Sequence, residues 1–153
     1  MKFKTLSVAA LALSAALAGA TASADTLKFG KTEDAVKYRQ NALFVMSQHF
    51  GSLGAMANGR AEFNADLAKQ NGAVLETLAT LPWQVFGAGT EGGKTKPEVW
   101  KEKAKFDGHA KDFVTEAGKL AAAAKTGDLA QLKAAFGPAA QTCKACHDAF
   151  RNR

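Results

Sequence analysis

The spacing of apolar residues constrains the fold of this chain more than any other feature. From residue 32 onward, apolar side chains recur at alternating steps of three and four, the period of one face of an α-helix. No segment alternates apolar and polar residues with a period of two, which is the pattern of a half-buried strand. The sequence therefore predicts an all-α protein that contains no sheet.

Capping and turn residues divide this pattern into four helical segments. Residues that favour helix starts are Thr32, Asn64, Pro97 and Asp128, and residues that favour helix ends are Asn58-Gly59, Pro82 and Gly127. In the second segment the predicted buried stripe is Leu67, Asn71, Val74, Leu78 and Leu81. In the fourth, Gly137-Pro138 is expected to kink or briefly break the helix. Four helices of similar length with mostly short connections predict an antiparallel, up-down-up-down four-helix bundle.

This topology brings distant parts of the chain to one end of the bundle. The start of the first helix, the glycine-rich connection 82–96 and the end of the fourth helix all fall there, because successive helices alternate in direction. Residues near 36–43, 82–100 and 143–151 are therefore expected to be neighbours. Both tryptophans, Trp83 and Trp100, belong to this set.

The first residues have the pattern of a secretory signal peptide. Lys2 and Lys4 precede an apolar run over residues 6–18, and Ala22-Ser23-Ala24 supplies small residues at the cleavage position. The run is too short to span a membrane. We expect cleavage after Ala24, so that residues 1–24 are a signal peptide and residues 25–153 form one exported domain with no membrane insertion.

Charge gives no sign of a nucleic-acid partner. The chain has a net charge of +6, which falls to +4 when Lys2 and Lys4 leave with the signal peptide. The remaining lysines alternate with acidic residues, as in Lys101-Glu102-Lys103, and form no block of like charge. These side chains are expected to form a solvated surface.

Cys143-Lys144-Ala145-Cys146-His147 is the motif that carries specific chemistry. Cys-x-x-Cys-His is the pattern of covalent c-type haem attachment. Two thiols add to the two vinyl groups on one porphyrin edge, so they must lie on one side of a short turn, and the next residue can then coordinate the iron. Both cysteines of the chain belong to this motif. The motif predicts one haem c, attached through Cys143 and Cys146, with His147 as iron ligand.

Other chemistries explain the same residues less well. A structural zinc site needs four ligands, and outside the motif only His49 and His109 remain, both expected to be ordinary surface or boundary histidines. A thioredoxin-like redox pair needs a strand–helix junction, and a local disulfide closes too short a loop to stabilise much. Gly93-Lys94-Thr95 ends like a phosphate-binding loop, but Ala88 stands where its first glycine is required.

Arg39 is a charged residue on the apolar stripe of the first segment. A charge that faces the bundle interior is costly unless it is paired. Because Arg39 falls at the expected haem end, we predict that its guanidinium binds a haem propionate and that Gln40 adds a hydrogen bond. The alternative is that Arg39 reaches past the end of the bundle into water.

The sixth position on the iron decides the function. Across the bundle from His147, the first segment offers Leu43, which cannot be a ligand. Met46 lies almost one turn deeper, where a methionine is more commonly part of the core. We therefore predict a pentacoordinate iron with an apolar distal face that admits small uncharged molecules. The alternative is a six-coordinate electron carrier with a methionine as sixth ligand.

The haem motif, the four segments and the export signal together resemble the cytochrome c′ family over essentially the whole mature chain. The stretches that carry the resemblance are residues 33–40, 81–83, 89–93, 134–137 and 143–151. The motif at 143–147 indicates only a c-type haem, and the stretch at 33–40 narrows the resemblance to this family.

The resemblance implies a periplasmic, usually dimeric bundle with one high-spin, pentacoordinate haem c. Such proteins bind nitric oxide and carbon monoxide and are linked to electron transfer with redox partner proteins and to nitric oxide tolerance, so we expect no enzymatic activity. Outer apolar residues of the first helix, such as Phe44, hint at the homodimer. The resemblance assigns Cys143 and Cys146 to the thioethers, His147 to the proximal ligand, Arg39 and Gln40 to haem contacts, Leu43 to the distal side, Arg151 to a basic residue near His147, and Thr90 and Glu91 to a loop at the haem edge.

The motif spacing makes a direct prediction about attachment. Haem should stay with the denatured protein during acid extraction, because thioether bonds do not depend on the fold. The combined change Cys143→Ala and Cys146→Ala should abolish this retention, measured by absorbance of the protein fraction. Clean extraction of haem from the unmutated protein would contradict covalent attachment.

Overall fold

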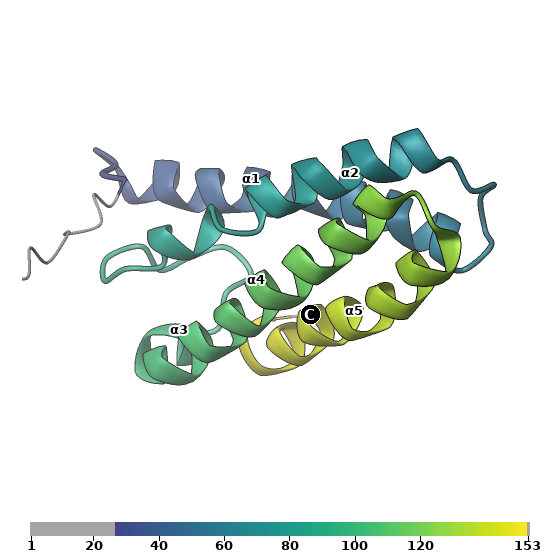
Figure 1. The fold of residues 1–153 in the computed structure, drawn as a ribbon. Coiled ribbons are helices and arrows are strands. Elements are labelled where there is room, and N and C mark those ends of the chain that lie inside the picture. Colours follow the sequence, from purple (N-terminus) through teal and green to yellow (C-terminus); the bar gives the residue numbers. More distant parts are fainter. Residues whose placement is uncertain (1–26, 153) are drawn as a thin grey trace, which may run out of the picture.

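The computed structural model describes residues 27–152. Its helices are α1 (Thr32–Ala57), α2 (Ala65–Leu78), the 3₁₀-helix η1 (Pro82–Val85), α3 (Glu98–Lys101), α4 (Lys103–Thr126) and α5 (Leu129–Phe150) (Figure 1). The signal peptide expected at residues 1–24 lies outside the described residues. Within residues 27–152, no helix has both the length and the apolar character that crossing a bilayer requires.

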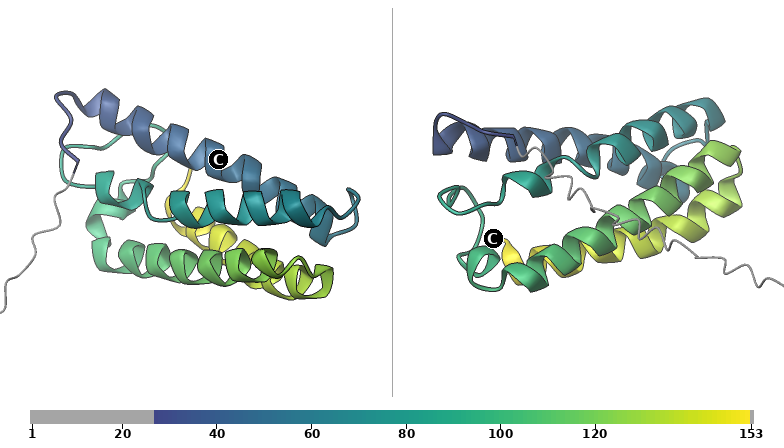
Figure 2. Two further views of the ribbon diagram at one scale, coloured as in Figure 1. Left: turned by 45° about the horizontal axis from the view of Figure 1, so that its top comes forward. Right: turned by 60° about the vertical axis from the view of Figure 1, so that its left-hand side comes forward.

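The four long helices form the predicted bundle. They contact one another in a ring, α1 with α2, α2 with α4, α4 with α5 and α5 with α1. The α1–α2 pair and the α4–α5 pair diverge toward the end that carries η1, α3 and the last turn of α5 (Figures 1 and 2). In the described part of the chain, β pairing is limited to one bridge between Thr95 and Arg151. The all-α prediction is confirmed.

Most helix ends follow the signals in the sequence. The Asn64 side chain caps α2 by accepting a hydrogen bond from the Leu67 amide at 2.9 Å. Asp128 caps α5 in the same way and accepts from two backbone amides of its first turn. Gly127 ends α4 with a left-handed φ of 71° that a side chain would disfavour. Local chemistry therefore fixes these boundaries.

Three predicted boundaries are wrong. Helix α2 ends at Leu78, before the predicted stop at Pro82, and Pro82 instead begins η1. The N-cap position of α1 is Lys31, and Thr32 is instead the first helical residue, whose hydroxyl donates to the Gly89 carbonyl at 2.7 Å. The predicted third helix is divided at Glu102, which has non-helical backbone angles, into the single turn α3 and the long α4. Trp100 on α3 donates its indole N–H to the Gly87 carbonyl at 2.8 Å. Thr32 and Trp100, which lie at two of these boundaries, therefore both bind the 87–89 loop.

Helix α5 continues through Pro138 without the predicted break. Proline lacks an N–H, so the Ala134 carbonyl loses its usual partner one turn away. Both Ala134 and Pro138 are exposed, and water can take the place of the missing donor. The helix therefore tolerates the proline and carries the Cys-x-x-Cys-His motif at its far end.

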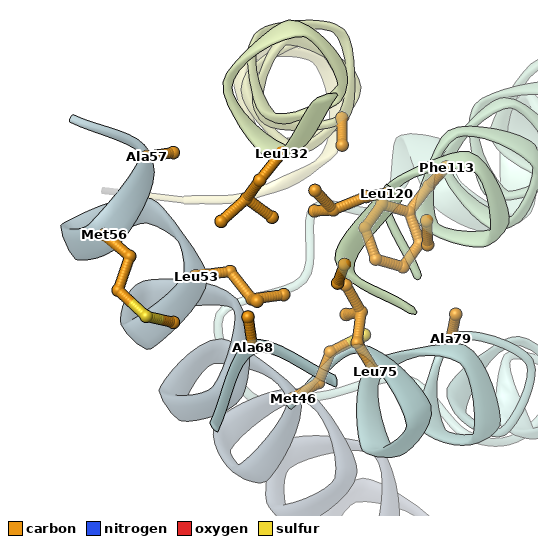
Figure 3. Close-up of a cluster of buried hydrophobic side chains, with 13 residues drawn as sticks. Met46, Leu53, Met56, Ala57, Ala68, Leu75, Ala79, Phe113, Leu120 and Leu132 are labelled. Atoms are coloured by element: carbon orange, nitrogen blue, oxygen red, sulfur yellow. The ribbon is translucent and has the colours of Figure 1, made fainter. Parts of the chain in front are cut away.

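One leucine from each long helix meets in the centre of the core. Leu53 of α1, Leu75 of α2, Leu120 of α4 and Leu132 of α5 are all completely buried, and their side chains converge in Figure 3. Full burial of a leucine stabilises a fold by about 1.5–3 kcal/mol. This layer therefore holds the four helices together away from the diverging end.

The buried face of α2 differs from the predicted stripe. Leu67 is 43% exposed, and the buried residues are Ala68, Asn71, Gly72, Leu75 and Ala79. A Cβ at Gly72 would lie 2.9 Å from the Ala124 Cβ. The small residues let α2 approach α4 closely, so packing rotates the helix away from the face that has the larger apolar side chains.

This close approach predicts opposite effects of two glycine substitutions. Gly72→Ala should lower the free energy of unfolding by about 1–3 kcal/mol, because overpacking outweighs the gain in helix propensity. Gly118→Ala on α4, where a Cβ meets nothing within 4 Å, should raise it by about 0.5–1 kcal/mol. Urea unfolding of both variants is the measurement, and equal effects would contradict the close α2–α4 packing.

Candidate functional site

A cavity of about 510 Å³ lies at the end of the bundle where the helix pairs diverge. Protein interiors rarely leave voids larger than a water molecule, and a space of this size is typical of a ligand or cofactor site. The lining side chains are Arg39, Gln40, Leu43, Phe44, Met46, Ser47 and Phe50 from α1, Trp83, Phe86, Lys94, Thr95 and Val99 from the chain between α2 and α4, and Phe106, His109, Phe113, Thr142, Cys143, Cys146, His147, Phe150 and Arg151 from α4 and the end of α5.

The predicted neighbourhood of three distant segments is confirmed. Residues from 36–43, 82–100 and 143–151 all contribute to the cavity wall. Thr90 and Glu91 do not line it: the Thr90 hydroxyl donates to the Gly87 carbonyl, and the Glu91 carboxylate accepts from a backbone amide of the same loop. Their contact with a haem edge stays a prediction.

The end of α5 brings two thiols and one imidazole to this cavity. Cys143 and Cys146 are free cysteines one helical turn apart. Burial raises the pKa of each thiol to about 11, so both are protonated at neutral pH. Partial burial and then the positive charge of Arg151 lower the pKa of His147, against the opposing effect of Asp148. A neutral imidazole is the form that can coordinate a metal.

This donor set fits a covalently bound haem. Two thiols suit two vinyl groups, one imidazole suits an axial ligand, and the aromatic side chains of Phe86, Phe106 and Phe113 supply apolar walls for a flat macrocycle. A structural zinc ion needs four ligands. Between residues 27 and 152, no cluster of three or more His, Cys, Asp or Glu side chains is arranged to hold a metal ion by itself.

Arg39 is buried, with 2% of its surface exposed, so it does not reach past the bundle into water. Its Nη1 donates to the Thr90 carbonyl at 2.6 Å and to the Val85 carbonyl at 3.5 Å, and its Nη2 donates to the Gly92 carbonyl at 3.0 Å. The guanidinium also lies 4.6 Å from the centre of the Phe86 ring. These carbonyl partners leave no signal in the sequence, and the predicted propionate contact stays a prediction.

These bonds hold the glycine-rich loop against α1. Burial lowers the pKa of Arg39, and the nearby Glu91 carboxylate opposes this effect. Gly93 has a φ of 64°, and a Cβ there would lie 2.6 Å from the Gln40 amide nitrogen. The Gln40 side chain can move away from such a Cβ, so it is the left-handed φ that favours glycine at this position of the loop.

Leu43 and Met46 are two of the α1 residues that line the cavity. Leu43 is half-buried and lies one turn after Arg39. Met46 is 5% exposed and packs in the same core cluster as Leu53 and Leu75 (Figure 3). Met46 therefore serves the core, as expected, and also contacts the cavity.

Phe86 and His109 are two of the wall residues that were not predicted from the sequence. Phe86 follows η1 in the connection, and its position over Arg39 depends on how that connection folds. His109 is half-buried, lines the cavity and meets the edge of Phe150 with ring centres 5.6 Å apart. His109 follows Phe106 by three residues and so shares its helix face, which is a signal that could have found it.

His49 lies away from the cavity, as expected. Its Nδ1 is 2.7 Å from the Asn71 Oδ1, and the Asn71 amide group donates to the Ser52 hydroxyl at 2.8 Å. This network satisfies a polar side chain that α2 buries against α1.

Comparisons with known proteins agree with this geometry. The family model described as cytochrome c′ matches residues 34–151. Cytochrome c′ of Alcaligenes xylosoxydans xylosoxydans is 49% identical over 82% of this chain and 99% of its own length. The Rubrivivax gelatinosus cytochrome c′ is 45% identical over 82% of this chain and 100% of its own. A solved nitric oxide complex of a variant cytochrome c prime from Alcaligenes xylosoxidans is 48% identical, covers 82% of this chain and 99% of its own, and superposes with a TM-score of 0.78.

The Arg39 contacts predict the effect of removing the charge. Arg39→Leu should lower the free energy of unfolding by about 1–3 kcal/mol, because buried carbonyl groups lose their donor. It should also expose the 85–93 loop to limited proteolysis and shift the reduction potential of the haem-loaded protein. Arg60→Leu, at an exposed arginine, is the control. An unchanged unfolding curve and potential would contradict the role of Arg39.

Proposed function

The chain belongs to the cytochrome c′ family, whose cofactor is haem c, and from this premise we propose that it is a gas-binding haem protein with a pentacoordinate, high-spin iron. The observation that carries the proposal is the difference between the residues that α5 and α1 contribute to the cavity wall. Cys143, Cys146 and His147 come from the end of α5, and Leu43, which cannot be a ligand, comes from α1. The iron then has one protein ligand and a free position.

In this proposal Cys143 and Cys146 hold the cofactor through thioether bonds and His147 coordinates it. Bound haem supplies a redox-active iron that takes diatomic ligands. Arg39 and Gln40 lie on α1, where their donors suit the carboxylates of the haem, and Arg151 lies beside His147, whose pKa it lowers. Arg39 still has N–H groups beyond those that bind the loop.

Leu43 and Phe50, which share one face of α1, select the ligand. Neither side chain offers a hydrogen bond or charge to an incoming molecule. Burying a charged ligand there is costly, whereas a small uncharged gas loses little. We propose nitric oxide and carbon monoxide as ligands, in keeping with the nitric oxide complexes solved for similar proteins.

We further propose a role in electron transfer with redox partner proteins or in nitric oxide tolerance, without enzymatic turnover. The signal pattern in residues 1–24 supports export to the periplasm. Phe44, Val45 and Leu67 expose 64%, 42% and 43% of their surface on α1 and α2, and this apolar area supports a homodimer.

One observation favours a second candidate. Met46 lines the cavity as well as the core. Its thioether is a suitable sixth ligand, and coordination by Met46 makes the protein a six-coordinate electron carrier.

The visible spectrum of the purified holoprotein tests both candidates. We expect a high-spin, five-coordinate spectrum in the reduced protein that changes when carbon monoxide is added. A low-spin spectrum that Met46→Leu converts to high spin would favour the electron carrier. The absence of a Soret band would contradict both candidates.

If the Leu43 side chain blocks access to the iron, its removal should change ligand binding. An incoming gas must displace the leucine side chain. Cutting a fully buried leucine to alanine loses about 2–5 kcal/mol of packing and leaves a cavity, and the half-buried Leu43 should lose part of that. Part of this loss is recovered when a ligand fills the space. Leu43→Ala should therefore bind carbon monoxide faster and more tightly, measured by stopped flow.

Leu78→Ala is the matched control, because Leu78 is also half-buried but does not line the cavity. It should lower stability without changing carbon monoxide binding. Identical kinetics in Leu43→Ala and the unmutated protein would show that another residue blocks the iron, with Met46 the first to test.

A further inference from the structure

The C-terminal end of α5 needs hydrogen-bond donors from outside the helix. An α-helix leaves its last four carbonyl groups without a partner within the helix. In α5 these groups belong to residues 147–150. The Arg151 amide donates to the His147 carbonyl at 3.0 Å. The carbonyls of residues 148–150 remain.

Lys96 supplies the donors for all three. Its Nζ donates to the Asp148 carbonyl at 2.9 Å and to the Ala149 carbonyl at 3.3 Å. Its backbone amide donates to the Phe150 carbonyl at 3.0 Å. The ammonium group also places a positive charge at the negative end of the helix dipole. One residue, far away in the sequence, therefore caps the helix that carries the haem motif.

Neighbouring contacts extend this cap into a strap, which we define as residues 94–96. The Asn152 amide donates to the Lys94 carbonyl at 2.8 Å, and Thr95 pairs with Arg151 in the isolated bridge. Lys94 and Thr95 also line the cavity. The strap thus connects the last turn of α5 directly to the cavity wall.

The connection between α2 and α4, which contains the strap, is hydrogen-bonded to both α1 and α5. Arg39 of α1 binds the carbonyls of residues 85, 90 and 92, and Lys96 binds those at the end of α5. Both attachments use a cationic side chain on backbone carbonyls, which gives stronger hydrogen bonds than neutral donors do. These two residues therefore attach the connection to α1 and to the end of α5.

We propose that Lys96 is a positioning residue that fixes the orientation of His147 toward the haem iron. His147 lies in the helical turn whose carbonyls Lys96 holds, directly before Asp148. Loss of the cap lets this turn fray and frees the imidazole to rotate. The part of the proposal that concerns the iron rests on the proposed function, whereas the capping of α5 does not.

Lys96→Met tests the proposal with little disturbance. The variant keeps the apolar stem of the side chain and the hydrogen bond from the backbone amide of residue 96 to the Phe150 carbonyl. It removes only the Nζ donor. We expect hydrogen exchange at the amides of Arg151 and Asn152 to become about tenfold faster or more. In the reduced holoprotein we expect the iron–histidine stretching band in the resonance Raman spectrum to shift or broaden.

Two further variants separate positioning from general stability. Lys96→Arg should restore both readouts, because a guanidinium also donates to two carbonyls. Lys101→Met is the control, since Lys101 is exposed and its side chain has no hydrogen bond or ion pair with another residue in 27–152. Faster exchange with an unchanged iron–histidine band would overturn the positioning role, and unchanged exchange would overturn the cap.

Failure of the proposed function gives a different result. A wild-type protein without a Soret band would contradict haem binding and with it the role of Lys96 toward iron. Hydrogen exchange at Arg151 and Asn152 would still decide whether Lys96 caps α5.

Discussion

The cavity end of this protein depends on a buried positive charge, Arg39, that forms no ion pair with a carboxylate within residues 27–152. Arg39 is 2% exposed and satisfies its guanidinium with three backbone carbonyls of the 85–92 connection. A buried charge with unmet hydrogen bonds is among the costliest features of a fold, so the connection and α1 stabilise each other only in this arrangement. Arg39 therefore both lines the cavity and holds the connection that closes one side of it.

The two ends of the bundle follow different packing rules. Away from the cavity, Leu53, Leu75, Leu120 and Leu132 close the core, and Gly72 lets α2 and α4 approach closely. At the other, the helix pairs diverge around a cavity of about 510 Å³ (Figure 2). The closed end supplies the stability that a poorly filled end lacks before its cofactor is bound.

The cavity places a set of thiol and imidazole side chains from one helix opposite a wall from another helix. The α5 helix brings the two thiols and the imidazole together by its own periodicity, since residues three and four apart share a face. The opposing wall comes from α1, which contributes Leu43 and Met46 to the lining. The chemistry of such a site therefore depends on the side chains that α5 and α1 each present to the cavity.

The sequence alone determined the helix boundaries at Asn64, Asp128 and Gly127, the bundle, and the motif at Cys143, Cys146 and His147, because periodicity, capping and thiol spacing are local properties. It also placed Arg39 and Leu43 at the same end as the motif, because antiparallel topology follows from short connections. Only the tertiary structure decided which face of α2 is buried, which carbonyls Arg39 binds, and that Lys96 caps α5. These contacts join residues about 50 positions apart, and such pairs depend on the packing of whole helices and on the path of a glycine-rich loop, neither of which leaves a periodic signal in the chain.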